Sequence, residues 1–136
     1  MKIVIDVNII LSALIKNSAT REIVMESGLD FCFPEPSLAK INKYLGYVIE
    51  KSGLSKDEYD IVLTNLLKHV DIVTVEEILR NWTEAKKIME HIDAEDVVFI
   101  ATAMCFENTV IWSDDKHFEK QNRIKVWKTS DLIRLL

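Results

Sequence analysis

Residues 3–10 read IVIDVNII, an apolar run interrupted by Asp6 and Asn8. The spacing predicts a buried strand over residues 3–5 and a helix over residues 8–15, so Asp6 stands where the strand ends. A carboxylate at the end of a buried strand is costly unless it is hydrogen-bonded, paired or bound to a cation. The stretch therefore predicts either a structural Asp6 bonded to nearby helix amides or a functional one.

Strands and helices are predicted to alternate along the rest of the chain. Further strands are expected at residues 31–33, 70–73, 109–112 and 124–127, and helices at 19–27, 36–51, 85–91 and from 130. Capping-box patterns begin helices at Ser55, Thr74 and Asn81. Residues 97–105, VVFIATAMC, carry no charge and predict a central buried helix. This order predicts a single α/β domain over residues 1–136, with a mainly parallel sheet flanked by helices.

Composition narrows the class of protein. A chain of 136 residues that is 49% hydrophobic supports one core. Its net charge of -5 argues against indiscriminate nucleic-acid binding through a uniformly basic surface. The chain has no signal-peptide pattern and no apolar run as long as a membrane span, so we expect a cytoplasmic protein. Cys32 and Cys105 lack CxxC spacing and are expected to be reduced core thiols.

Acidic residues stand at element ends that a parallel sheet brings to one edge. Asp114 and Asp115 follow a later strand as Asp6 follows the first, and Asp93 and Asp96 begin the buried helix. Ligands bind outside the carboxyl ends of parallel strands, so the carboxylates at positions 6, 96 and 115 are expected to share a pocket. Helix capping or a first-turn position is the alternative role for Asp93 and Asp114.

A group of carboxylates needs a cation, because like charges raise one another's pKa. Oxygen donors without clustered Cys or His favour one or two ions of Mg²⁺ or Mn²⁺. Such an ion activates water and neutralises the charge that grows on a phosphate ester during hydrolysis. The three histidines, at 69, 91 and 117, share no metal-ligand spacing, and surface or packing roles are expected for them. His117 is of interest only because it lies close to Asp115 in the chain.

Three motifs resemble, in order and spacing, those of the PIN-domain family of metal-dependent ribonucleases, which includes toxins of toxin–antitoxin pairs. They are IVIDVNIILSALI (3–15), DAEDVVFIATAM (93–104) and VIWSDDKHF (110–118). The resemblance runs essentially from end to end and implies a parallel sheet between helices. It implies that Asp6, Asp96 and Asp115 are catalytic and hold the metals, that Asn8 orders the first loop, and that Ser113 lies near the metals. It also implies RNA as substrate, with an antitoxin or a second copy of the chain as candidate partners.

One position departs from the family pattern. The family carries a glutamate on the helix after the second strand, and Lys40 best matches that place. Glu35 lies about a turn and a half earlier and is a weak substitute. Two hypotheses follow: a site that works with fewer acids, or a catalytically weakened protein that binds RNA or a partner. The Lys40 ammonium either contacts an RNA phosphate or lies on the surface without a role.

Residues 116–134 carry six Lys or Arg and two acids. A basic edge beside an acidic pocket suits RNA, and Lys116, Lys120 and Arg123 are expected contacts. Trp127 either stacks on a base or lies in the core. A third hypothesis is a phosphoryl-transfer domain, but haloacid-dehalogenase-like phosphatases need a second Asp at Asn8, and response-regulator receivers need an acidic pair near the first strand.

Overall fold

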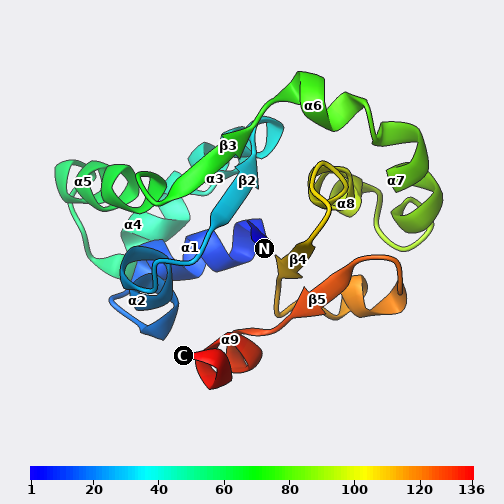
Figure 1. Cartoon of the computed structure of the whole chain (residues 1–136). Helices are drawn as coiled ribbons and strands as arrows, with labels where there is room; N and C mark the ends of the chain where they lie inside the picture. Colours follow the sequence, from blue (N-terminus) through cyan, green and yellow to red (C-terminus); the bar gives the residue numbers. More distant parts are fainter.

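Five parallel strands form one sheet in the computed structural model, which describes residues 1–136 (Figure 1). The strands are β1 (Lys2–Ile5), β2 (Phe31–Pro34), β3 (Val70–Val73), β4 (Thr109–Trp112) and β5 (Lys125–Trp127). Their order is β3-β2-β1-β4-β5, and every neighbouring pair is parallel. The predicted α/β fold with a parallel sheet is therefore confirmed.

Helices cover both faces of this sheet (Figure 1). The layer on one face consists of α1 (Val7–Ile15), α2 (Ala19–Glu26), α3 (Leu38–Lys43), α4 (Leu45–Ser52) and α5 (Lys56–Leu67). The layer on the other face consists of α6 (Val75–Leu79), α7 (Trp82–Met89) and α8 (Val97–Ala103), and α9 (Thr129–Leu135) contacts β5. Three short 3₁₀ helices are η1 (Glu35–Ser37), η2 (Ala94–Asp96) and η3 (Lys116–Lys120). None of the helices has the length and apolar composition that a membrane crossing requires.

The predicted central helix is confirmed as α8, all seven residues of which are buried. It contacts β1, β2 and β4. The Phe99 ring lies 6.1 Å from Phe33 and 6.2 Å from Phe118, centroid to centroid. This aromatic row joins β2, α8 and η3, and so holds the start of α8 close to the loop after β4. Cys32 and Cys105 are free thiols, as expected, and burial raises the pKa of Cys32 to about 12.

The prediction of one continuous helix over residues 36–51 was wrong. The chain forms η1, α3 and α4 instead, with a break at Tyr44. The Tyr44 N–H is shared between the carbonyls of Lys40 and Ile41, a tightened last turn that neither Pro nor Gly marks at that position. The capping box at Ser55 is confirmed. The one at Asn81 is not, because its amide donates to the Ala101 carbonyl at 3.3 Å.

The sheet order creates a switch point between β1 and β4. The chain passes from β1 to β2 on one side, whereas β4 and β5 lie on the other. In open parallel sheets the crevice at such a point, outside the carboxyl ends of the strands, is where ligands bind. Ile5 pairs with Trp112, so the next residues, Asp6 and Ser113, leave the sheet side by side.

Candidate active site

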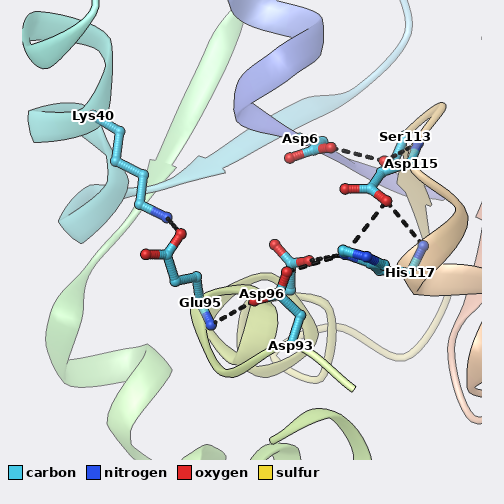
Figure 2. Close-up of polar contacts among 8 residues, drawn as sticks. All are labelled: Asp6, Lys40, Asp93, Glu95, Asp96, Ser113, Asp115 and His117. Carbon is cyan, nitrogen blue, oxygen red and sulfur yellow. Dashed lines mark hydrogen bonds and ion pairs between the residues drawn. The ribbon is translucent and has the colours of Figure 1, made fainter. Parts of the chain in front are cut away.

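Asp6 and Ser113 form the buried floor of the site (Figure 2). The Ser113 hydroxyl donates to Oδ2 of Asp6 at 2.7 Å, and the two residues are 3% and 1% exposed. The same hydroxyl oxygen accepts the Asp115 N–H at 3.0 Å. One serine therefore joins the ends of β1 and β4, because the strand register leaves its side chain beside Asp6.

Burial raises the pKa of Asp6, and the Asp115 charge raises it further. The Ser113 hydrogen bond and the backbone N–H groups of Val7 and Asn8 lower the pKa of the same carboxyl. Asp115 itself is half-buried, and its Oδ1 accepts the His117 N–H at 2.9 Å, an N-cap contact at the start of η3. Both carboxylates are thus held by short hydrogen bonds, and the charge of Asp115 acts on Asp6.

Asp96 enters the pocket from η2, at the start of α8. Its side chain is 13% exposed, and the buried oxygen Oδ2 has no hydrogen-bond partner. Burial raises the Asp96 pKa to about 7, and the charges of Asp93, Asp6 and Asp115 add to this effect, whereas Lys40 opposes it. A buried acceptor without a donor and a group of repelling carboxylates both fit a divalent cation. Asp6, Asp96 and Asp115 face the same pocket, and each of the other two charges raises the Asp96 pKa (Figure 2).

His117 lies between Asp115 and the pair formed by Asp93 and Asp96 (Figure 2). The Nδ1 atom of His117 is 3.0 Å from Asp93 Oδ2, 3.5 Å from Asp115 Oδ1 and 3.9 Å from Asp96 Oδ2. Asp93 also caps η2, since its Oδ1 accepts the Glu95 N–H at 3.0 Å. The alternative capping role is thus observed for Asp93 together with a place at the pocket. The central place of His117 was missed, because the sequence separates it from Asp93 and shows only that it follows Asp115.

Lys40 reaches the edge of the pocket from α3 (Figure 2). Its Nζ lies 3.8 Å from Oε2 of Glu95, whose side chain is 82% exposed. The position where a fourth acid was expected therefore holds a cation beside Asp96. Glu35 does not replace that acid, because its Oε1 accepts the Val75 N–H at 3.0 Å at the start of α6.

Two of the predicted supporting residues act elsewhere. Asp114 turns away from the pocket and accepts both the N–H and the hydroxyl of Thr129, at 2.9 and 2.8 Å, where α9 begins. Asp114 therefore stabilises the start of a helix, which was its predicted alternative role, but the helix is α9 and not η3. Asn8 is exposed, and its side chain makes no hydrogen bond, so only its backbone N–H acts on Asp6.

The predicted RNA contacts are also divided between two edges of the sheet. Lys116 and Lys120 are exposed on η3 and form no ion pair, but only Lys116 directly follows Asp115. Lys120 lines a hollow with Arg123 and with Lys87 of α7. Arg123 lines a hollow with Asn108 and Thr109 at the amino end of β4, so the structure does not bring it to the pocket.

The two tryptophans near this edge differ in burial. Trp127 is half-buried, and the Lys125 ammonium lies 5.4 Å from its ring centre. Trp112 is fully buried, as expected.

The fold and the site together define a parallel α/β domain with carboxylates gathered at its switch point. The family model of the PIN domain matches residues 4–134, and the chain belongs to that family. PIN domains are generally nucleases that use divalent metals. No curated protein matches the chain.

Proposed function

We propose that this protein is an endoribonuclease that depends on a divalent metal and hydrolyses RNA phosphodiester bonds with metal-activated water. The observation that supports the proposal is that the carboxylates of Asp6, Asp96 and Asp115 face one pocket and act on one another's pKa (Figure 2). Carboxylates in this arrangement suit Mg²⁺ or Mn²⁺. RNA fits as the polyanion whose hydrolysis such an ion assists.

Each residue has a distinct role in this proposal. Asp6, Asp96 and Asp115 would hold the cation, which supplies an activated water and neutralises charge on the phosphate when bound. Ser113 fixes the orientation of Asp6 through its 2.7 Å hydrogen bond. Lys116 is exposed directly after Asp115, Lys120 is exposed at the far end of η3, and both would contact phosphates along the RNA strand. No protein nucleophile is required.

Cleavage of labelled RNA tests the proposal. We expect cleavage with Mn²⁺, none with EDTA, recovery with excess Mn²⁺, and at least about a 100-fold loss in Asp6→Asn. Asp57→Asn is the matched control, because Asp57 is exposed at the start of α5 and its side chain makes no hydrogen bond. Unchanged cleavage in Asp6→Asn would identify a contaminant and contradict the assignment.

A catalytically weakened protein that binds RNA or another partner is the second candidate. Lys40 favours it, because its cation stands beside Asp96 where the family carries an acid. This candidate predicts that the protein binds RNA in a gel-shift assay and leaves it intact in Mn²⁺.

The biological role proposed for the nuclease is that of a toxin in the cytoplasm, held inactive by an antitoxin. The membership of toxins in the family supports this role. Induced expression should then arrest growth, expression of Asp6→Asn should not, and a small protein encoded next to this gene should restore growth. Sedimentation of the purified protein would show whether it forms the homodimer that the resemblance implies.

A further inference from the structure

His117 and Asp93 have no part in the proposed function as described so far, yet they face the same pocket. The His117 ring leans over Asp96 from η3, and Asp93 faces it from the start of η2 (Figure 2). One ligand atom each from Asp93, Asp96 and His117 lies within 4.8 Å of the other two. Asp96 belongs both to this cluster and to the group formed with Asp6 and Asp115.

We infer that Nδ1 of His117 is a metal ligand, and that Asp93, Asp96 and His117 form a second cation position that prefers Mn²⁺ to Mg²⁺. The inference rests on the proposed metal-dependent function and adds a nitrogen donor to it. In this inference the cluster supplies the metal ligand that the family's fourth acid would supply, because Lys40 stands at the position of that acid.

The distances suit an octahedral ion. At metal–ligand bonds of about 2.1 Å, neighbouring ligand atoms are about 3.0 Å apart and opposite ones about 4.2 Å apart. Nδ1 of His117 lies 3.0 Å from Asp93 Oδ2 and 3.9 Å from Asp96 Oδ2. Small side-chain rotations bring all three atoms to bonding distance, because none of them is tied to a distant element by another bond.

The oxygen of Asp96 is an independent sign of a ligand. Oδ2 is the atom of Asp96 that faces His117, and it is buried without a hydrogen-bond partner. A buried polar atom of this kind is uncommon in native proteins and calls for an explanation such as a bound ion. An ion between Asp93, Asp96 and His117 gives this oxygen a partner.

The surrounding contacts hold the imidazole over the cluster. The backbone N–H of His117 donates to Oδ1 of Asp115, and the adjacent Phe118 is fully buried against Phe99. The backbone at residue 117 is therefore fixed on both sides. Ligation through Nδ1 uses the tautomer that carries its proton on Nε2. Asp93 Oδ2, which now lies against Nδ1, then turns to the ion.

A nitrogen donor changes which metal is preferred. Carboxylates and water suit both Mg²⁺ and Mn²⁺, whereas imidazole suits transition metals. Mg²⁺ also gives up its water reluctantly and is usually held through one or two carboxylates. An Asp–Asp–His cluster therefore binds Mn²⁺ more tightly than it binds Mg²⁺.

Pulsed electron paramagnetic resonance of the Mn²⁺-loaded protein tests the inference. We expect modulation from a coordinated imidazole ¹⁴N in the wild type and in His69→Asn, and its loss in His117→Asn. His69 is exposed between α5 and β3, at the amino end of the strand, and is therefore a matched control. By calorimetry, His117→Asn should lower Mn²⁺ affinity about tenfold and leave Mg²⁺ affinity nearly unchanged.

Asp93→Asn gives a second readout. Asparagine also caps helices, so η2 is retained. This variant should keep the ¹⁴N signal and lose Mn²⁺ affinity. Mn²⁺ binding and RNA cleavage by the wild type without ¹⁴N modulation would overturn the inference and leave the proposed function intact. A wild type that binds no Mn²⁺ would overturn both.

Discussion

Two sides of the pocket are built in different ways. The strand wall consists of Asp6, Ser113 and Asp115, and the helix wall consists of Lys40 and Glu95 (Figure 2). In the strand wall, Asp6 and Ser113 are nearly inaccessible and joined at 2.7 Å. In the helix wall, the ion pair is 3.8 Å long and its acid is 82% exposed.

This difference indicates which residues of the site can be substituted at little cost in stability. The pairing of β1 with β4 fixes the strand wall, so a change there disturbs buried bonds that have no substitute. An exposed ion pair contributes only about 0–1 kcal/mol. We therefore expect substitutions in the helix wall to have smaller effects on stability than substitutions in the strand wall.

The largest effect is expected from Asp115→Asn in the strand wall. Loss of a proposed metal ligand should lower RNA cleavage at least about 100-fold. Asp114→Asn is the neighbouring control, because Asp114 binds Thr129 and not the pocket. It should change cleavage less than about twofold and cost about 1 kcal/mol of unfolding free energy. Equal loss of cleavage in the two variants would argue against the division between site and scaffold.

A pH effect on stability is expected from Asp96, which stands between the two walls. Its pKa is about 7 in the folded protein and 3.8 ordinarily, so between these values the folded state binds a proton that the unfolded state lacks. The stabilisation is complete below about pH 4 and is lost as pH rises through about 7. We expect it to amount to about 2 kcal/mol after solvent screening.

Thermal unfolding in EDTA at pH 5.5 and 8.5 measures this effect. The wild type and Asp57→Asn should be less stable at pH 8.5 than at pH 5.5, and this difference in unfolding temperature should be smaller in Asp96→Asn, which retains only the raised pKa of Asp6. Mn²⁺ should restore the wild type at pH 8.5, because the ion replaces the proton. An identical pH dependence in the wild type and Asp96→Asn would contradict the assignment.

A smaller effect, a loss of metal affinity, is expected from Ser113→Ala in the strand wall. This variant removes the donor to Asp6, so the Asp6 pKa should rise further and metal affinity should fall about tenfold. Calorimetric titration with Mn²⁺ measures the change. Ser113→Thr is the conservative control, since it keeps the hydroxyl. If alanine and threonine behave alike, the hydrogen bond has no role in metal binding.

The smallest effect, a modest gain in metal affinity, is expected from Lys40→Glu in the helix wall. Replacing a cation by an acid near Asp96 should raise metal affinity about fivefold, which corresponds to about 1 kcal/mol. Cleavage should rise with it, and stability should change little because the Lys40–Glu95 ion pair is 3.8 Å long and its acid is 82% exposed. Lys43→Glu, on the same helix, controls for net charge. No gain beyond that of the control would count against Lys40 as the cause of weak activity.

Much of the fold follows from local patterns in the sequence. Strands β1, β2 and β4 each contain a short buried apolar run, and the uncharged stretch 97–105 indicates a buried element, so the centre of the sheet and α8 were predictable. The meeting of Asp6 and Asp115 was predictable as well, because parallel strands direct their carboxyl ends to one edge.

Side-chain direction is what the sequence could not show. Asp114 and Asp115 are adjacent, yet one binds the start of α9 and the other faces the pocket. His117 joins Asp93 only because Phe118 anchors η3 against α8, which is a tertiary contact. The break at Tyr44 also lacks a local marker, because neither Pro nor Gly stands at that position.

The hydrogen bond between Ser113 and Asp6 joins residues 107 positions apart in the chain. Such a contact forms only after β4 has been synthesised and has paired with β1, and pairings this distant in sequence form slowly. A growing chain on the ribosome therefore carries Asp6 without the rest of the site until residues 109–115 have been made. With the proposed activity, nascent chains cannot cut the messenger that encodes them until β4 and the loop after it have emerged.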